Sequence, residues 1–262
     1  MPELPDVEAV VRMLRRRVVG GRIERVRILD HAVVRSPTAS AFVRRLRGRV
    51  IQRVYRRGKY LLLSLGRGTT VVGHLRMTGD LIVVPRDSPI QRHTRLVIGL
   101  DGKDIRFVDP RRFGHVDLVA THALSSFEGL RDLGVEPLSS AFTQELLQDF
   151  VRARRGSLKA FLLRQNLVAG IGNIYADEIL FQARLRPDRR TGSLRASEVR
   201  RLHQAIRSAL RRGIEASSGH GGVAGDLVDV RVRDGTCPRC HRGLRTVSVG
   251  GRTSYFCPRC QG

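Results

Sequence analysis

The sequence predicts an α+β multidomain protein, in which an N-terminal helix and a β-sandwich precede a helical domain and a cysteine-bearing β-hairpin. Apolar residues recur at helical spacing from Leu4 to Val18. Between residues 22 and 120, short apolar or alternating runs are separated by glycine and proline turns, which is typical of a sandwich or barrel. After residue 121 helical spacing replaces this pattern until the C-terminal tail.

The expected elements follow in order along the chain. The first helix ends at Gly20-Gly21, because adjacent glycines are poor helix formers. Strands are expected within residues 22–29, 50–56, 60–65, 69–75, 81–84, 96–100, 105–108 and 115–119. Helices are expected within residues 144–154, 158–163, 174–183 and 197–216.

These changes of pattern divide the chain into domains. We expect the sandwich domain in residues 1–120, a linker in 121–135, the helical domain in 136–225 and the cysteine-bearing hairpin in 226–262. A glycine-rich stretch, residues 219–225, is interpreted as a mobile loop.

The charge of the chain indicates its partner. At 262 residues with 41% hydrophobic content, the chain is long enough for two modest domains with their own cores. The formal net charge of +24 predicts a polyanionic partner, and nucleic acid is the expected one. Because the sequence has no apolar run of 18 residues and no signal peptide, we expect a cytoplasmic protein without a membrane partner.

Arginine is strongly preferred over lysine, and this compositional bias contributes to the charge. Lysine occurs only at positions 59, 103 and 159, so arginine supplies the other 45 of the 48 basic residues. A retained lysine therefore marks a place where a compact, deprotonatable ammonium is needed. Lys103 follows a predicted Asp101-Gly102 hairpin turn and is interpreted as incidental, which leaves Lys59 and Lys159 as candidates.

The N-terminus is a candidate active site. Removal of Met1, usual before a small residue, would leave Pro2 as a secondary amine beside the carboxylate of Glu3. An α-amino group has a pKa of about 7.7–8.0, so a useful fraction is nucleophilic near neutral pH. Such an amine forms an iminium with an aldehyde-level sugar carbon, and Glu3 would protonate a ring oxygen or a leaving base. A helix start with proline in its first turn is the alternative interpretation.

The cysteines predict a metal site. They form two Cys-x2-Cys knuckles, made of Cys237, Cys240, Cys257 and Cys260. Paired knuckles are typical of tetrahedral thiolate zinc, and disulfides are disfavoured in the cytosol. We therefore expect one structural zinc ion, because four thiolates leave no open position for catalysis. Between the knuckles, Arg242, Arg245 and Arg252 would decorate a zinc-held hairpin that can bind phosphate.

Residues 170–178 hold a candidate anion site. The glycines permit a tight turn, Asn173 can cap the helix that follows, and free backbone N–H groups at its start would bind an anion. Lys159 can supply additional charge. A plain corner between two helices is the alternative interpretation.

Two predicted loops place bulky apolar side chains beside arginine. Met77 lies in the loop of residues 74–79, and Phe113 lies in the loop of residues 109–114 with Arg111. In a basic protein such an apolar wedge can fill the hole left by an extruded nucleotide, while arginine hydrogen-bonds the unpaired base. Buried packing is the alternative interpretation.

These motifs together resemble the bacterial formamidopyrimidine-DNA glycosylases, within the wider family that includes endonuclease VIII. The resemblance spans nearly the whole chain. It is carried by MPELPDVE at residues 1–8, GKYLLL at 58–63, HLRMTG at 74–79, DPRRFG at 109–114, GIGNIY at 170–175 and the cysteine knuckles. Leu4 and the set of Met77, Arg111 and Phe113 resemble the oxidised-purine branch more than the endonuclease VIII branch.

The resemblance implies roles for the candidate catalytic residues. Pro2 would be the Schiff-base nucleophile and Glu3 the general acid. Lys59 would assist β-elimination and hold a phosphate near the lesion. Arg252, on the zinc hairpin, would grip phosphate and assist δ-elimination.

The resemblance also implies a set of DNA-binding residues. Met77, Arg111 and Phe113 would form the void-filling triad, with Arg111 facing the orphaned cytosine. Backbone contacts are implied for His74, His93, Arg154, Lys159 and Asn173. The expected fold is a β-sandwich with an N-terminal helix, a helix-two-turns-helix domain and a C-terminal zinc finger.

The function that follows is a bifunctional DNA glycosylase and AP lyase of base excision repair. It would excise oxidised purines, formamidopyrimidine and 8-oxoguanine, and nick the strand by β,δ-elimination. The expected partner is double-stranded DNA containing a damaged base, bound by a monomer at the nucleoid. Two alternatives remain: the same mechanism with an endonuclease VIII-like preference for oxidised pyrimidines or hydantoins, and a non-catalytic zinc-finger DNA-binding protein.

The sequence departs from the family pattern at three places. Asp6 stands where the family usually has glutamate, and Arg164 stands where an aspartate is expected. The segment of residues 213–236 is shorter than the one that includes the loop closing over the extruded base. Its usual Tyr-Gly-Arg approach to the zinc finger is replaced by Val-Arg-Val-Arg at residues 230–233, so base specificity stays open.

Overall fold

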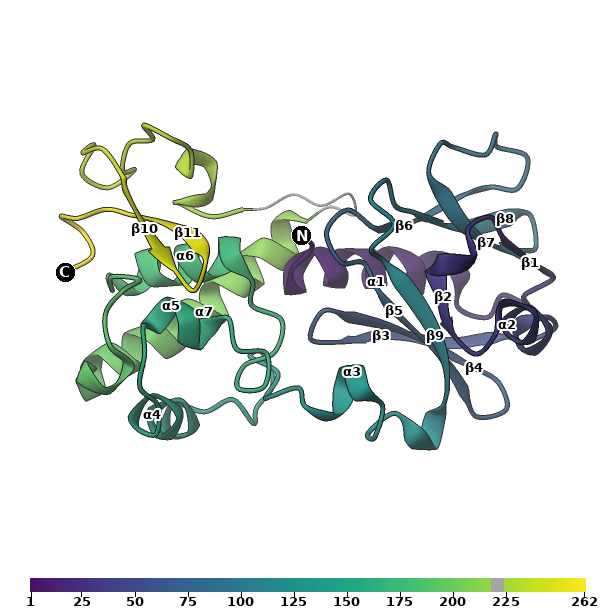
Figure 1. The fold of residues 1–262 in the computed structure, drawn as a ribbon, viewed down its shortest axis with the longest axis horizontal. Helices are drawn as coiled ribbons and strands as arrows, with labels where there is room; N and C mark the ends of the chain where they lie inside the picture. Colours follow the sequence, from purple (N-terminus) through teal and green to yellow (C-terminus); the bar gives the residue numbers. More distant parts are fainter. Residues whose placement is uncertain (218–223) are drawn as a thin grey trace. The chain divides into compact units, whose positions relative to one another are not determined.

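The computed structural model describes residues 1–217 and 224–262, which form two units (Figure 1). The first unit comprises Met1–Pro2 and Asp6–Arg131, and the second comprises Glu3–Pro5 and Asp132–Gly262. Sheets in the first unit, helices in the second and a C-terminal hairpin confirm the predicted α+β fold class. Within the described ranges, no helix is long and apolar enough to cross a membrane.

Helix α1 (Leu4–Val18) buries one face, as its spacing predicts. Val7, Val11 and Leu14 are fully buried in the core of the first unit, because positions three and four apart share a face. Gly20, with a φ of 86°, takes a left-handed conformation after the helix and ends it.

Two sheets share this core with α1. One sheet has the strand order β2-β9-β5-β4-β3, and the other has the order β1-β7-β8-β6. The strands are β1 (Arg25–Ile28), β2 (Val34–Ser36), β3 (Ile51–Arg57), β4 (Tyr60–Leu65), β5 (Thr69–His74), β6 (Asp80–Pro85), β7 (Thr94–Leu100), β8 (Lys103–Val108) and β9 (His115–Ala120). Neighbours are antiparallel except β2 and β9, which pair in parallel. Leu63 of β4 and Phe107 of β8 are buried in the core that the two sheets share.

Some elements of the first unit were not expected from the sequence. Helix α2 (Ala39–Leu46) has only Phe42 and Leu46 buried, so its apolar face was too short to give a periodic pattern. Strand β2 forms through parallel pairing with a distant strand, which local sequence does not indicate. Short helical elements, η1 (His31–Val33), η2 (Thr121–Ala123) and α3 (Glu128–Arg131), also form.

The second unit is built from helices around its own core. They are α4 (Gln144–Arg152), α5 (Leu158–Leu162), α6 (Asn173–Ala183) and α7 (Ala196–Ala216), with η3 (Thr191–Ser193) and η4 (Val228–Val230) between longer elements. Thr143 and Ser157 cap α4 and α5, because each side-chain oxygen accepts a backbone N–H of the first turn. Helix α6 is buried on nearly all sides, and Leu4 from the N-terminus joins this core.

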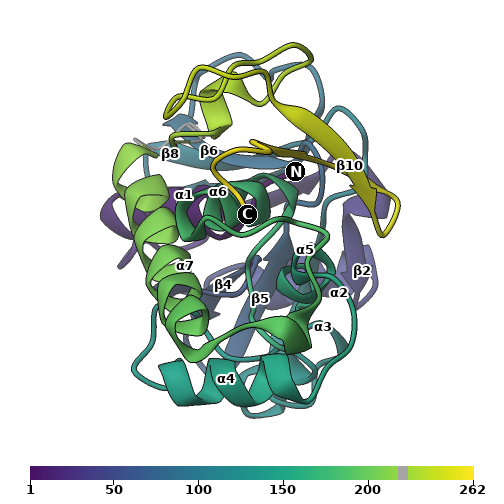
Figure 2. The same cartoon turned by 90° about the vertical axis from the view of Figure 1, so that its left-hand side faces the viewer.

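The C-terminal hairpin consists of β10 (Arg245–Val249) and β11 (Arg252–Phe256). Gly250 and Gly251 form its turn with φ values of 57° and 72°, which glycine adopts without strain. Figures 1 and 2 show this hairpin beside α6, and the backbone N–H of Tyr255 donates to Asp177 of that helix. Most of the expected glycine-rich loop, residues 218–223, lies outside the described residues.

Candidate functional site

Glu3 is anchored to the start of helix α6. Its carboxylate accepts backbone N–H groups of Gly172 at 2.7 Å, Ile174 at 2.8 Å and Tyr175 at 3.2 Å. These N–H groups have no partner within the helix and lie at its positive end, so they favour a carboxylate there. Glu3 is only 2% exposed. The anion that the sequence predicts at this helix start is therefore a side chain of the chain itself.

Two glycines allow this close approach. A Cβ at Gly172 would lie 2.3 Å from Cδ of Glu3, and one at Gly170 would lie 2.7 Å from Leu4. Gly170 also has a φ of 92°, which a side chain rarely adopts. The backbone N–H of Leu4 donates to the carbonyl of Gly170 at 3.0 Å. The glycines thus hold the residues after Pro2 in one place.

Asn173 does not cap α6, contrary to the expectation. The N-cap is Gly172, and Asn173 is the first helical residue. Its side-chain amide donates to the carbonyl of Thr253 in β11 at 3.4 Å. Its Oδ1 is buried without a hydrogen-bond partner in the described chain. Asn173 therefore contacts the hairpin and keeps an unused acceptor.

Lys159 is fully buried, and its ammonium is bound within the second unit. It forms an ion pair with Asp177, donates to the carbonyl of Asn173 at 3.2 Å and contacts Oγ of Ser254 at 3.3 Å. Burial lowers the pKa of Lys159, while Asp177 opposes that shift. In this arrangement the Lys159 ammonium fixes α6 and β11 and is not presented to an external phosphate.

Asp177 is the centre of this buried cluster. Its carboxylate accepts Lys159, the hydroxyl of Ser254, the backbone N–H of Tyr255, and Nε of Arg231 at 2.7 Å. The guanidinium of Arg231 also lies over the Tyr255 ring, 4.9 Å from its centroid, which is within the reach of about 6 Å for a cation–π contact. Arg231 belongs to the segment that departs from the family pattern, and it ties that segment to α6 and the hairpin.

In the first unit, Lys59 occupies the turn between β3 and β4. Gly58 precedes it with a φ of 54°, and Lys59 is 7% exposed. Pro2 is half-buried and belongs to the same unit. Glu3 and Arg252 belong to the second unit, so the four predicted catalytic residues are divided between the two units.

The loops of Met77 and Phe113 are joined by Asp109. Its carboxylate accepts the hydroxyl of Thr78 and the backbone N–H groups of Arg111 at 3.1 Å and Gly114 at 2.7 Å. Burial alone would raise the pKa of Asp109, but these hydrogen bonds hold it below its usual value. One buried carboxylate therefore fixes the position of both loops relative to each other.

The predicted void-filling side chains are exposed, as a wedge must be. Met77 is 40% exposed and Phe113 is 51% exposed, which is unusual for large apolar residues. The Arg111 guanidinium lies 4.8 Å from the Phe113 ring centroid. The structure thus brings Arg111 and Phe113 together and excludes buried packing for Met77 and Phe113.

Both predicted backbone-contacting histidines lie near these loops. His74 is 9% exposed, and its Nδ1 accepts the N–H of Arg76 at 2.9 Å. Burial, assisted by the charge of Arg76, lowers the pKa of His74 to about 3, so the ring is neutral near neutral pH. His93 has a φ of 69°, and its carbonyl accepts the N–H of Asp109 at 3.0 Å.

The four cysteines converge as a zinc site requires. Their sulfur atoms all lie within 4.8 Å of one another. Sγ of Cys237 is 3.8 Å from that of Cys260, and Sγ of Cys240 is 3.5 Å from that of Cys257. Zinc–sulfur distances of about 2.3 Å in a tetrahedron place sulfurs about 3.8 Å apart, so the arrangement fits.

Two predicted phosphate contacts are exposed in the second unit. Arg252 begins β11 directly after the Gly250-Gly251 turn, and its side chain has no partner within residues 1–217 and 224–262. Arg154 is also exposed, and within residues 1–217 and 224–262 its guanidinium donates only to the carbonyl of Ala153. Both guanidinium groups are available to an external anion.

Family models cover nearly the whole chain. Residues 1–116 match the formamidopyrimidine-DNA glycosylase N-terminal domain, and residues 133–223 match the formamidopyrimidine-DNA glycosylase H2TH domain. Residues 235–262 match a zinc finger found in FPG and IleRS. The formamidopyrimidine-DNA glycosylase of Pelotomaculum thermopropionicum is 42% identical, with 100% of this chain and 99% of that protein covered. This chain belongs to the formamidopyrimidine-DNA glycosylase family.

Further relatives agree with this family. The formamidopyrimidine-DNA glycosylase of Symbiobacterium thermophilum is 45% identical and covers 100% of this chain, with 89% of that protein covered. A crystal structure of the LlFpg protein with THF-DNA and an inhibitor has a TM-score of 0.92 at 32% identity, covering 100% of both chains. Lactococcus lactis formamidopyrimidine DNA glycosylase bound to AP-site DNA has a TM-score of 0.89 at 31% identity, covering 99% of both chains.

Membership in the formamidopyrimidine-DNA glycosylase family confirms three of the expectations. The chain is a DNA repair glycosylase with a zinc finger, and the cysteine cluster holds a structural zinc ion. The family match favours this enzyme over the non-catalytic zinc-finger alternative.

Sequence reasoning missed the residues that support the site. Asp109 lies in the motif DPRRFG, but nothing in the sequence indicated that it would join two loops. Asp177 directly follows the stretch GIGNIYA. An acidic residue within a helix that is otherwise largely buried was the signal that could have identified it. Arg164 is exposed, and its side chain has no ion-pair partner in the described ranges. The missing aspartate is therefore not replaced by another local ion pair.

Proposed function

We propose that this family member is a bifunctional glycosylase and AP lyase that acts on a damaged base in double-stranded DNA through the amine of Pro2. The observation that carries this proposal is the fixed carboxylate of Glu3, bound by three N–H groups directly after Pro2. A general acid must be held within reach of the reacting group. Removal of Met1 would expose the secondary amine beside it.

The proposed reaction begins at C1′ of the damaged nucleotide. The Pro2 nitrogen bonds to C1′ as the glycosidic bond breaks, and the base leaves with that electron pair and takes up a proton. The Glu3 carboxylate takes up the proton that the Pro2 nitrogen loses as it bonds to C1′ and passes it to the ring oxygen or the leaving base. Ring opening then leaves an iminium between Pro2 and C1′. The iminium withdraws electrons and acidifies the C2′–H bond.

Elimination then cleaves the strand. Loss of the C2′ proton expels the 3′-phosphate, and a second elimination expels the 5′-phosphate. Lys59, in the β3–β4 turn, is proposed to assist the first elimination and hold a phosphate. Arg252 is proposed to bind phosphate and assist the second elimination. Its exposed guanidinium, which has no partner among the described residues, supports this role.

The exposed triad supports extrusion of the base. Met77 and Phe113 are proposed to fill the space that the damaged nucleotide leaves, and Arg111 to hydrogen-bond the orphaned cytosine. His74, His93, Arg154 and Asn173 are proposed backbone contacts. Because His74 is neutral, it would donate a hydrogen bond to phosphate rather than form an ion pair. For Lys159, the buried ion pair favours a supporting position behind Asn173.

The relatives support the proposed substrate class. Solved neighbours are described as bound to an abasic site and to Fapy-dG containing DNA. This supports formamidopyrimidine as a substrate, and we propose 8-oxoguanine as a further oxidised purine and a monomeric enzyme. The shortened segment of residues 213–236, whose glycine-rich stretch 219–225 offers few side chains to contact an extruded base, motivates a related candidate, with activity on formamidopyrimidines and ring-rearranged purines at least equal to that on 8-oxoguanine.

Borohydride trapping tests the mechanism. The mature chain should give a covalent adduct with a lesion duplex, mapped to Pro2, while a form that retains Met1 should give none. Pro2→Gly replaces the secondary amine with a less constrained primary amine and should trap more weakly. An adduct on Lys59 or another lysine would overturn the assignment of Pro2.

Single-turnover rates on matched duplexes test the lesion preference. An 8-oxoguanine rate at least tenfold above the formamidopyrimidine and hydantoin rates, about 1.4 kcal/mol of discrimination, would contradict the related candidate. Faster excision of oxidised pyrimidines would instead indicate an endonuclease VIII-like preference.

A further inference from the structure

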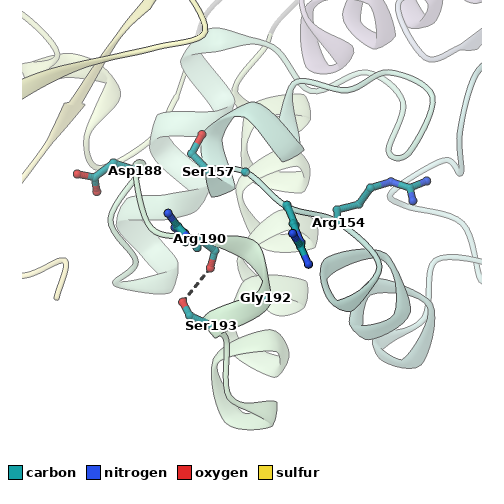
Figure 3. A pocket seen from close by; sticks show the side chains of 8 residues that line it. Arg154, Ser157, Asp188, Arg190, Gly192 and Ser193 are labelled. Atoms are coloured by element: carbon teal, nitrogen blue, oxygen red, sulfur yellow. Dashed lines mark hydrogen bonds between the residues drawn. The ribbon is translucent and has the colours of Figure 1, made fainter.

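A cavity in the second unit lies outside the residues proposed for chemistry. It has a volume of about 870 Å³ and is lined by two loops, the first entering α5 and the second following α6. The lining residues are Arg154, Arg155, Gly156, Ser157, Asp188, Arg190, Gly192 and Ser193. Figure 3 shows the two loops facing each other across this space.

The two loops are fixed to one another. The N–H of Leu158 donates to the carbonyl of Arg189 at 2.8 Å, and the N–H of Thr191 donates to the carbonyl of Gly156 at 2.9 Å. The hydroxyl of Thr191, a buried residue, donates to the carbonyl of Arg154 at 2.7 Å. Because backbone bonds set the walls, the cavity does not depend on long, mobile side chains for its shape.

The charge in the cavity is unbalanced. Its one acidic residue, Asp188, is held by Arg186 through bonds of 3.0 and 2.8 Å, which lower the pKa of Asp188. In the same loop, Arg189 is paired with Glu198 at 2.6 Å. Arg155 and Arg190 are different, because neither side chain has an acidic or hydrogen-bonding partner in the described parts of the chain.

The arrangement of the guanidinium groups indicates the kind of anion. Figure 3 shows Arg154 extending away from Arg190, so the positive charges are spread along the cavity. Spread charges suit a run of phosphates better than a single small anion. Guanidinium groups bind phosphate oxygens in a planar, bidentate geometry. The Ser157 hydroxyl accepts the N–H of Ala160 and keeps its own proton to donate, whereas the Ser193 hydroxyl already donates to the carbonyl of Arg190.

We propose that this cavity is a further phosphodiester site, in which Arg155 and Arg190 bind the DNA backbone next to the phosphate contacted by Arg154. The proposal rests on the DNA partner proposed above, but not on the chemistry at Pro2. The site adds affinity without reading sequence or lesion, because phosphate contacts carry no base information. It enlarges the DNA contact of the helical unit.

Salt dependence of binding to an undamaged duplex tests this site. Each phosphate contact contributes about 0.9 to the slope of log affinity against log salt concentration. The Arg155→Gln/Arg190→Gln variant should therefore give a slope that is shallower by about 1 to 2. Its affinity for an undamaged duplex and its affinity for an abasic-site duplex should fall by the same factor. Arg44→Gln/Arg45→Gln is the matched control, because it removes two exposed arginines of α2 whose side chains have no partner in the part of the chain that the structure describes.

Three results bear on the proposed phosphodiester site. An unchanged slope, or an equal change in the control, would overturn the proposal. Tripolyphosphate binding that is lost in the variant without a change in the DNA slope would identify a site for free anions and would also overturn it. Borohydride trapping at saturating DNA should be unaffected, so failure of the Pro2 mechanism in the unmodified chain is distinguishable from failure of this site.

Discussion

At the residue scale, the site depends on two carboxylates whose positions are fixed by hydrogen bonds, mostly from backbone N–H groups. Glu3 receives three backbone N–H groups, and Asp109 receives two together with the hydroxyl of Thr78. Both carboxylates are buried, so their hydrogen bonds are not weakened by exchange with water. Orientation at these residues is therefore set by backbone geometry.

Gly172→Ala should impair base excision while leaving the fold largely intact. The added Cβ would lie 2.3 Å from Cδ of Glu3, so the carboxylate must move. Because misplacement by about 1 Å can cost about 100-fold in rate, we expect a loss of at least tenfold in single-turnover excision. Gly243→Ala is the control, since nothing lies within 4 Å of a Cβ there. Equal rates for the two variants would contradict the role of the close approach.

His74 should make stability depend on pH below neutrality. Its pKa is lowered to about 3 in the folded protein, against about 6.5 when unfolded. As pH falls below 6.5 the unfolded chain takes up a proton and the folded chain does not, so stability falls with decreasing pH. Between pH 7 and pH 5 this amounts to about 2 kcal/mol.

Urea unfolding of the full chain at pH 7 and pH 5 measures this effect. His74→Asn keeps an acceptor for the N–H of Arg76 but does not titrate there. The variant should lose about 2 kcal/mol less than the unmodified chain between these pH values. His115, whose pKa burial lowers to about 4, stays in both proteins and contributes equally. An identical pH dependence would show that His74 is protonated in the folded state.

At the scale of elements, one buried carboxylate connects α5, α6 and the hairpin. Lys159 comes from α5, Asp177 from α6 and Ser254 from β11, and Arg231 follows η4. The hairpin carries Arg252 and contacts Asn173 through the carbonyl of Thr253. The cluster therefore sets the position of proposed phosphate contacts from two elements.

Asp177→Asn should destabilise the second unit strongly. Removal of one partner from a buried ion pair typically costs about 3–5 kcal/mol, because the other charge stays buried. The double variant Asp177→Asn/Lys159→Met should be less destabilised than the sum of the single variants. Asp188→Asn, in an exposed ion pair with Arg186, should cost less than about 1 kcal/mol. Additive free energies of unfolding would contradict direct coupling between Asp177 and Lys159.

Loss of one zinc ligand should unfold the finger without unfolding the sandwich. Structural zinc contributes an apparent binding free energy of about 10–16 kcal/mol at neutral pH, and the hairpin has few other buried residues. Cys257→Ser should therefore lose stoichiometric zinc by elemental analysis and lose DNA affinity, while strand content of the first unit persists by circular dichroism. Full affinity in a zinc-free protein would contradict the role of the finger.

At the scale of the whole molecule, charge dominates the expected behaviour. The formal net charge of +24 would remain even if every acidic residue were paired, because 48 basic residues stand against 24 acidic ones. If about 6–10 phosphates are contacted, affinity for duplex DNA should fall about 10³–10⁵-fold between 50 and 200 mM salt. Fluorescence anisotropy with a labelled duplex measures this dependence. A nearly flat profile would show that the charge reflects composition alone.

The sequence predicted most elements, because their information is local. Helical spacing identified α1, α4, α5, α6 and α7, and alternation identified most strands of the sandwich. Helix α2 was missed, because it buries only Phe42 and Leu46. The paired cysteines predicted the zinc site correctly, because ligand type and spacing define that site almost completely.

The sequence by itself determined which groups are present: an amine next to a carboxylate, bulky apolar side chains beside arginine, four cysteine thiols and an excess of arginine. The tertiary structure decided what those groups contact. Asn173 was expected to cap its own helix, yet Glu3 bonds to the N–H groups there. Lys159 was expected at a phosphate, yet it pairs with Asp177. These partners lie far apart in sequence, and which buried charge meets which donor depends on long-range packing that no local pattern specifies.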